Sequence, residues 1–197
     1  PLRYPHVFFA DDPSLHPSKG FLLHGPPGTG KTMLARAIAK EASVPFLSLG
    51  LSTLENKYYG ESSKLLRACF DLARKMQPCI LFFDEIDGVC RRRSEMDQSC
   101  VYGLKTELLS RMDGLTSRPD DAVIVIGCTN CPSSLDSALL RRLPRSFSIG
   151  LPSFEERMDI LKKMGVSGPK TRSFVASRTE GKTGSDLKEV FRRASGE

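Results

Sequence analysis

A glycine-rich stretch, Gly25-Pro26-Pro27-Gly28-Thr29-Gly30-Lys31-Thr32, fits the pattern G-x-x-x-x-G-K-[ST] at every position. The apolar run 21–23 precedes it, and segment 33–42, with apolar residues at helical spacing, follows it. Where a strand leads into a helix, the first backbone N–H groups of the helix have no partner within it, and the helix dipole adds partial positive charge. Both features favour phosphate, whereas a chance glycine-rich turn would not require these flanking elements.

The residues of this loop predict different contacts with a nucleoside triphosphate. Glycines let the backbone wrap closely around phosphates. Lys31 would reach the β- and γ-phosphates, and the Thr32 hydroxyl would ligate Mg²⁺. The predicted cofactor-binding residues of the loop are Pro27, Gly28, Thr29, Gly30, Lys31 and Thr32.

Two carboxylates, Asp84 and Glu85, follow the near-continuous apolar run 79–83. Such a run is typical of a central parallel strand buried on both faces. Ligands of open α/β sheets bind at the carboxyl ends of strands. Asp84 would therefore hold Mg²⁺, directly or through water, and Glu85 would act as the base or orienter of an attacking water. The alternative is a pair of solvated acids in a turn.

Asn130 follows a second buried strand, predicted at 123–127. This position would place it beside the acidic pair, where its side chain could hydrogen-bond the γ-phosphate or the attacking water. An asparagine after a strand also suits an ordinary turn. Position alone leaves both interpretations open.

The pattern of apolar residues predicts alternating strands and helices. Strands are expected at 21–23, 45–49, 79–83, 123–127 and 147–151, and helices at 33–42, 61–76, 100–112, 135–140 and 152–164. A linker at 165–169 and a basic helical segment at 170–197 follow. The expected core-facing positions are Leu34, Ile38 and Ala42, then Leu65, Cys69, Leu72 and Met76, then Leu104, Leu108 and Met112. This order predicts an α/β fold with a doubly wound parallel sheet and a helical appendage.

The composition is that of an ordinary globular chain, with 197 residues, 40% hydrophobic and 26% charged. No run approaches the roughly 20 apolar residues that a membrane-spanning helix needs. The net charge of +6 is too small by itself to indicate nucleic-acid binding. Cys128 and Cys131 form a lone C-x-x-C, a weak signal for a metal or redox site without further ligands.

Several motifs in this order together resemble an AAA ATPase module. They are the glycine-rich loop, Asp84-Glu85-Ile86-Asp87, Thr129-Asn130, the stretch 135–142 ending in Arg141-Arg142, and Gly181-Lys182-Thr183-Gly184-Ser185-Asp186-Leu187. Within the family the chain is most similar to the meiotic clade, which includes katanin, spastin and fidgetin. Segments 75–78 and 141–144 resemble the mitochondrial outer-membrane translocases, which extract mislocalised tail-anchored proteins.

The resemblance implies a P-loop NTPase sheet of order 5-1-4-3-2 in residues 1–152 and a small helical lid, apparently truncated, in residues 153–197. ATP and Mg²⁺ are the implied cofactors. Asn130 would sense the nucleotide, Gly184 and Ser185 would approach the adenosine, and Arg141 and Arg142 would be arginine fingers that reach a neighbouring subunit. An arginine pair also suits a helix C-terminus.

The resemblance also implies a homohexamer whose central pore is lined by Lys57, Tyr58, Tyr59 and Gly60, with 91–96 as a second pore loop. Two tyrosines before a helix also commonly cap a core. Compared with the family, the segment before the glycine-rich loop and the lid are both short, which predicts a piece of a longer protein. Ser146 stands where relatives usually carry a basic residue.

The expected function is Mg²⁺-dependent ATP hydrolysis that drives unfolding, extraction or translocation of a polypeptide through a hexamer pore, including extraction of mislocalised membrane proteins. The alternatives are a microtubule-severing ATPase, a nucleic-acid-directed P-loop ATPase and an inactive nucleotide-binding scaffold. No nucleic-acid partner and no membrane span in this chain are expected, while an anchor outside it stays open. The expected location is the cytoplasm, or the cytosolic face of the mitochondrial outer membrane.

Overall fold

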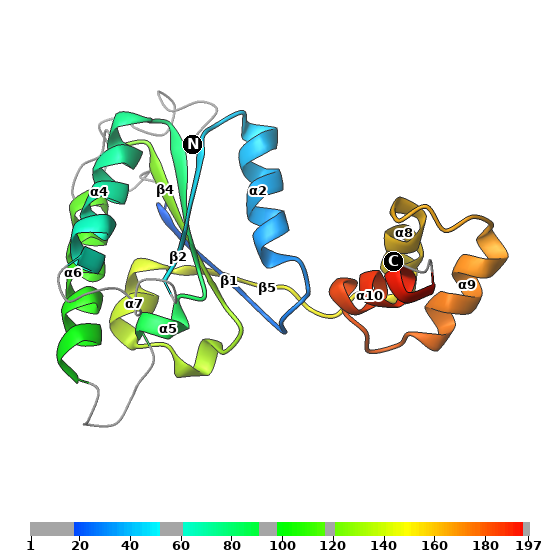
Figure 1. Cartoon of the computed structure of the whole chain (residues 1–197). Helices are drawn as coiled ribbons and strands as arrows, with labels where there is room; N and C mark the ends of the chain where they lie inside the picture. Colours follow the sequence, from blue (N-terminus) through cyan, green and yellow to red (C-terminus); the bar gives the residue numbers. More distant parts are fainter. Residues whose placement is uncertain (1–17, 52–60, 91–97, 117–120, 195–197) are drawn as a thin grey trace. The chain divides into compact units, whose positions relative to one another are not determined.

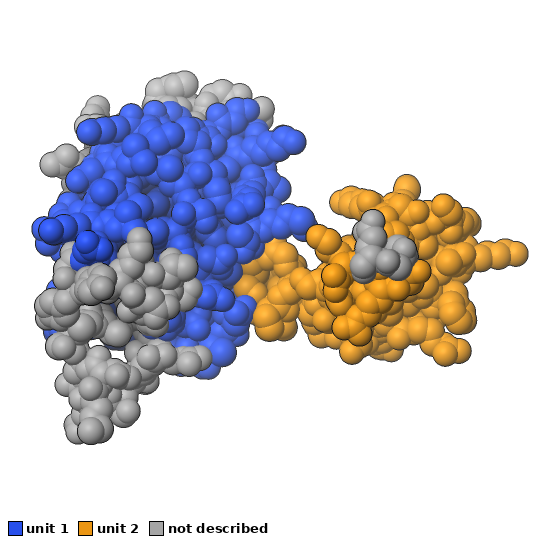
Figure 2. Space-filling model, in the orientation of Figure 1, with its two compact units in different colours: residues 1–24, 32–147 blue, residues 25–31, 148–197 orange. Residues whose placement is uncertain are grey.

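The computed structural model describes residues 18–51, 61–90, 98–116 and 121–194. The chain forms two compact units, shown in Figure 2. The first comprises residues 1–24 and 32–147, and the second comprises residues 25–31 and 148–197. The glycine-rich loop is therefore grouped with the C-terminal part of the chain, although it is covalently continuous with the first unit at both ends.

A five-stranded sheet forms the centre of the first unit. Its order is β2-β3-β4-β1-β5, which confirms the predicted order read from the opposite edge. The pairs β2/β3, β3/β4 and β1/β4 are parallel, and Phe83 lies opposite Gly127. The strands are β1 (Gly20–His24), β2 (Phe46–Gly50), β3 (Cys79–Asp84), β4 (Val123–Thr129) and β5 (Arg145–Ser148).

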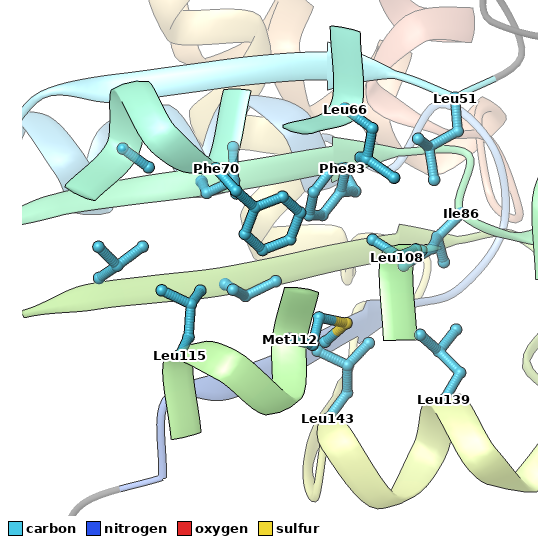
Figure 3. Packing of buried hydrophobic residues seen from close by; sticks show 14 of the residues in the cluster. Leu51, Leu66, Phe70, Phe83, Ile86, Leu108, Met112, Leu115, Leu139 and Leu143 are labelled. Atoms are coloured by element: carbon cyan, nitrogen blue, oxygen red, sulfur yellow. The ribbon is translucent and has the colours of Figure 1, made fainter. Parts of the chain in front are cut away.

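Strand β3 is buried on both faces because helices cover both sides of the sheet (Figure 1). Alternate side chains of a strand point to opposite faces. Accordingly, Leu81 and Phe83 enter one hydrophobic cluster, while Ile80 and Phe82 enter another. Figure 3 shows the first cluster, in which Phe70 and Phe83 meet with ring centroids 5.8 Å apart.

Helix α2 (Lys31–Ala42) lies in the predicted place but presents a different face to the sheet. Ala35 and Ala39 are its buried residues, whereas Leu34 and Ile38 are 37% and 42% exposed, so the predicted core positions were wrong. The sheet face below α2 already carries Phe82. Small side chains on the helix complement that large ring, because a close-packed interior leaves little volume on either side.

Helix α4 (Glu61–Lys75) shows the same one-residue error. Its buried residues are Leu66, Phe70 and Ala73, while the predicted Leu65 and Leu72 are exposed. Two apolar stripes run side by side along this helix, and both have helical spacing. Packing between Phe70 and Phe83 favours the stripe that contains the aromatic ring.

Helix α6 (Gln98–Thr116) buries Leu104, Leu108 and Met112 as predicted. It does not end at Asp113-Gly114 but continues for another turn. Glycine inside a helix costs about 1 kcal/mol relative to alanine. Burial of Leu115 offsets that cost, and Lys19 Nζ donates a hydrogen bond of 3.0 Å to the Leu115 carbonyl.

Four short elements also differ from the prediction. A 3₁₀ turn, η2 (Pro132–Ser134), precedes α7 (Ser137–Arg142), which was predicted at 135–140. Asp136 explains the later start, because its side chain accepts a 2.8 Å hydrogen bond from the Ala138 N–H and caps the helix. Strand β5 lies at Arg145–Ser148 rather than 147–151. Helix α5 (Asp87–Cys90) was not predicted.

In the part of the second unit that the structure describes, three helices follow β5: α8 (Phe154–Lys163), α9 (Pro169–Arg178) and α10 (Gly184–Ala194). A capping box at Ser153 and Glu156 starts α8. Arg157 is buried in this unit and donates to the Ala176 carbonyl, which ties α8 to α9. No described helix has the length and apolar character needed to cross a membrane.

Glycine at position 20 is required by a close approach of α7 to β1. A Cβ on Gly20 would lie 1.8 Å from the Arg142 carbonyl oxygen, whereas a Cβ on Gly103, in α6, would meet no atom within 4 Å. We predict that Gly20→Ala lowers the free energy of unfolding by about 1–3 kcal/mol, the usual range for overpacking. Gly103→Ala should raise it by about 0.5–1 kcal/mol, because alanine favours the helix. Urea unfolding measures both, and a Gly20→Ala protein as stable as the unmodified one would contradict the close approach.

Candidate functional site

The carboxyl end of β3 carries the two predicted acids. Asp84 is the last residue of the strand, and its Oδ1 accepts a 3.1 Å hydrogen bond from the Glu85 backbone N–H. The strand behind them is fully buried, while Glu85 is exposed. The apolar run therefore ends at the sheet edge with its acids directed out of the core.

Thr32 and Asp84 come from distant parts of the chain and meet in the first unit. Thr32 Oγ1 donates a 2.9 Å hydrogen bond to Asp84 Oδ2. The first turn of α2 supplies the hydroxyl, and the end of β3 supplies the carboxylate. Oxygen donors of this kind suit Mg²⁺, which protein sites commonly hold through one or two carboxylates together with phosphates. Among the described residues, no group of three His, Cys, Asp or Glu side chains could hold a metal ion.

Glu85 has a backbone φ of 50°, which is uncommon for a residue other than glycine. Such a conformation costs of order 1–3 kcal/mol and persists only where neighbouring contacts hold it. Ile86 supplies them: its N–H donates 2.9 Å to the Cys128 carbonyl, and its side chain is fully buried. The sharp turn keeps Glu85 outside the sheet while the chain on both sides remains anchored.

The turn after β3 is also fixed by a pair that sequence reasoning missed. Thr129 Oγ1 donates a 2.9 Å hydrogen bond to Asp87 Oδ1 and accepts a 3.0 Å hydrogen bond from the Cys131 N–H. Thr129 is buried, whereas Asn130 is exposed and makes no hydrogen bond to another described residue. Thr129 is adjacent to Asn130, and Asp87 lies two residues after Glu85, so their position near predicted site residues was the available signal.

A glycine separates the Glu85 turn from the end of α7. A Cβ on Gly127 in β4 would come within 2.9 Å of Leu143 Cδ1 and 3.1 Å of Ile86 Cδ1. Leu143 and Ile86 are both buried. Ile86, which follows Glu85, and Leu143, which follows the arginine pair, thus both pack against the position that lacks a side chain at Gly127.

The glycine-rich loop belongs to the second unit, where Lys31 is 6% exposed. Its Nζ donates to the carbonyls of Gly25 and Pro26, at 2.8 and 2.7 Å. An ammonium group has three N–H donors, so these two bonds leave one for a further acceptor. Gly28 and Gly30 have φ of 77° and 91°, conformations that glycine adopts readily. The loop therefore has the backbone shape and the cation that a phosphate requires.

The start of α10 contacts the same loop. The Ser185 N–H donates 3.3 Å to the Gly28 carbonyl, and a Cβ on Gly28 would lie 2.8 Å from Thr183 Oγ1. Thr183 and Asp186 cap the helix reciprocally, with bonds of 2.9 and 3.2 Å. The bond from the Thr183 backbone is the main reason that the pKa of Asp186 is lowered. The structure thus brings the predicted Gly184-Ser185 pair to the phosphate loop.

The remaining predicted residues divide into two groups. Arg141 and Arg142 lie at the C-terminal end of α7, where Arg141 is exposed and Arg142 is half-buried. Lys57, Tyr58, Tyr59 and Gly60, and the segment 91–96, lie outside the described residues. The structure therefore tests neither predicted pore loop.

Comparison with known proteins identifies the family that the sequence motifs resemble. The sequence profile of the ATPase family associated with various cellular activities (AAA) matches residues 21–151. The crystal structure of the FIGL-1 AAA domain in complex with ADP superposes with a TM-score of 0.84 at 35% identity, covering 95% of this chain and 62% of that one. The chain belongs to the AAA ATPase family.

Curated relatives of two names match the chain. The outer mitochondrial transmembrane helix translocase of Danio rerio is 44% identical over 199 positions, 99% of this chain and 52% of the relative. The Homo sapiens translocase is 45% identical, and the match covers 99% of this chain and 55% of the relative. The probable spastin homolog spas-1 of Caenorhabditis briggsae is 44% identical over 187 positions, which cover 91% of this chain and 34% of the relative. The chain spans about half the length of the translocases that it matches.

Members of this class bind ATP, typically with Mg²⁺, and the geometry fits both. Thr32 and Asp84 would hold the metal, and Lys31 with the loop backbone would hold phosphates. Bound Mg²⁺ neutralises charge on the phosphates.

The Thr32 hydroxyl can be removed without changing the size of the side chain. We predict that Thr32→Val weakens Mg²⁺ binding to the nucleotide complex by at least about 10- to 100-fold, because loss of a ligand should cost no less than loss of a group that only supports a ligand. ATP binding without Mg²⁺ should change little. Titration of Mg²⁺ with a fluorescent ATP analogue measures the effect, and Thr32→Ser, which keeps the hydroxyl, is the control. An unchanged Mg²⁺ dependence in Thr32→Val would contradict the assignment.

Proposed function

We propose that the protein hydrolyses ATP at this site and uses the energy to extract or unfold polypeptides. The observation that carries the proposal is the Thr32–Asp84 hydrogen bond beside the exposed Glu85. It joins a metal-binding hydroxyl, a metal-binding carboxylate and a candidate base at the end of one buried strand. The translocases among the relatives named above support the proposal that the energy of hydrolysis is used to move polypeptides.

Each residue has a distinct proposed role in hydrolysis. Lys31 and the backbone of residues 27–30 bind the phosphates. Glu85 accepts a proton from the attacking water or orients it in line with the leaving group. Asn130, exposed after β4, would hydrogen-bond the γ-phosphate or that water. The φ of Glu85 supports its role, because strained backbone recurs at catalytic positions.

We further propose that residues 1–152 form the nucleotide-binding subdomain and residues 153–197 the lid. Gly184 and Ser185 would approach the adenosine from the start of α10. Support comes from the bond between Ser185 and the Gly28 carbonyl in the second unit. This contact would let the lid helix respond to the conformation of the phosphate loop.

AAA ATPases are typically oligomeric, and we propose a homohexamer for this protein. Arg141 would then reach the γ-phosphate bound by the next subunit. Its exposure supports this role, since the Arg141 side chain makes no hydrogen bond or ion pair with the described residues. A finger supplied from another subunit neutralises charge on the transferred phosphoryl group.

The proposed substrates are mislocalised membrane proteins, and the proposed location is the cytosolic face of the mitochondrial outer membrane. The translocase matches, which cover 99% of the chain, support this choice. Microtubule severing is the second candidate, supported by the 44% identity to the spastin homolog. Incubation with a liposome-embedded tail-anchored protein and, separately, with stabilised microtubules distinguishes the two.

Binding and hydrolysis should separate in two variants. We predict that Lys31→Ala abolishes ATP binding, because the loop loses its phosphate-binding cation. Glu85→Gln should retain binding but lower phosphate release by about 10²- to 10⁴-fold, the usual contribution of a general base. Filter retention of labelled ATP and phosphate release measure the two steps. Lys40→Ala, an exposed lysine on the same helix, is the control. Full hydrolysis by Glu85→Gln would refute its role.

The proposed pore tyrosines can be tested although they lie outside the described residues. We predict that Tyr58→Ala/Tyr59→Ala keeps its melting temperature and ATPase activity but fails to extract a model substrate, because aromatic rings grip chains of varied sequence. Tyr102→Ala, which truncates a tyrosine that is 69% exposed on α6, is the matched control. If the rings belonged to a core, truncation would cost about 3–5 kcal/mol each and lower the melting temperature strongly.

A further inference from the structure

The two consecutive arginines of α7 leave the helix in different directions. Successive residues of an α-helix are about 100° apart around its axis. Leu139 and Leu143 define the buried side of the helix end and enter the same hydrophobic cluster as Met112 of α6 (Figure 3). Arg141 lies about 200° around from Leu139, on the outer side, while Arg142 lies about 60° from it.

Arg142 is bound within its own subunit through three of its atoms. Nε and Nη2 donate to Asp113 Oδ1 and Oδ2, at 2.8 and 2.6 Å, and Nη1 donates 2.7 Å to the Ala138 carbonyl. The pair with Asp113 is bidentate, the arrangement in which arginine and a carboxylate interact most strongly. This hydrogen bonding is the main reason that the pKa of Arg142 is raised.

The other end of α7 is fixed to the same helix. Asp136, which caps α7, forms an ion pair with Lys105 of α6. Asp113 also belongs to α6, so one long helix holds both ends of the short one. The Arg142 carbonyl meanwhile rests against Gly20 of β1. Helix α7 is thus fixed to α6 at both ends, and its last residue contacts β1.

We propose that Arg142 is a positioning residue: its pair with Asp113 fixes the end of α7 so that Arg141 alone is presented as the finger. The proposal rests on the function proposed above. It assigns different roles to two adjacent arginines that the sequence treats as equivalent. To act as a finger, Arg142 would have to give up two charge-assisted hydrogen bonds, whereas Arg141 has no such bond among the described residues.

Removing Asp113 distinguishes the roles, because this acid has no part in a finger mechanism. We expect Asp113→Ala and Arg142→Ala each to lower kcat for ATP by about 10- to 100-fold, as misplacement of a catalytic group by about 1 Å does. The KM for ATP should stay unchanged, since the subunit's own phosphate loop is untouched. The control is Asp71→Ala. Asp71 is an exposed acid whose Oδ1 lies 3.8 Å from Nη1 of Arg111, an arginine of α6.

Exchanging the two charges gives the decisive comparison. The Asp113→Arg/Arg142→Asp protein restores the ion pair but carries no arginine at 142. We expect its kcat to return to within about tenfold of the unmodified protein, in contrast to Arg141→Ala, for which the loss should reach about 10³–10⁵. A fully active Asp113→Ala protein would show that the pair is not needed and would overturn the proposal. An exchanged protein that remains folded but is as inactive as Arg142→Ala would also overturn it, because Arg142 would then act as a finger.

Hydrogen exchange gives a second readout that does not depend on hydrolysis. Amides 137–142 should exchange faster in Asp113→Ala and in Arg142→Ala, and return to the slow rate in the exchanged protein. Amides of β3 and β4 should stay unchanged, which excludes general unfolding. If the unmodified protein hydrolyses no ATP, the proposed function fails, while exchange in α7 still decides whether the pair fixes the helix. Unchanged exchange in Asp113→Ala would overturn the proposal.

Discussion

Parallel pairing of β3 with β4 is the constraint on which the site depends. It sets Phe83 opposite Gly127, so the chain segments after both strands leave the sheet at the same edge. The Ile86 N–H then bonds to the Cys128 carbonyl, and Thr129 bonds to Asp87, across the same pair of segments. The positions of the exposed Glu85 and Asn130 follow from this pairing. Neither residue needs a side-chain bond to hold it, because the backbone on each side is anchored.

The fold was predictable from the sequence to the extent that it depends on patterns within single segments. Buried runs at 79–83 and 123–127 mark central strands because few other structures bury consecutive residues on both faces. The error at α2 and α4 has a different origin. Each helix has two adjacent apolar stripes, and the choice between them is made by partners such as Phe82 and Phe83 on the sheet. Periodicity within the helix contains no information about those partners.

The candidate site was predictable in its chemistry but not in its supports. A glycine-rich loop, a strand-end acid pair and an asparagine are short signals with a physical reason for each residue. The bonds Thr129–Asp87 and Arg142–Asp113 join residues 42 and 29 positions apart, and nothing local distinguishes these acids from solvated ones. The extension of α6 past Gly114, which keeps Asp113 inside a helix, likewise depends on the distant Lys19.

Gly127 has a consequence for how this protein can change over time. Ile86 and Leu143 both occupy the space that a side chain at this position would need. Ile86 follows the proposed base Glu85, and Leu143 follows the arginine pair at the end of α7. A mutation at 127 would therefore disturb two segments at once, the turn that carries Glu85 and the end of the helix that carries Arg141. Variation at this position is therefore constrained by two segments that lie far apart in the sequence, and not by the strand alone.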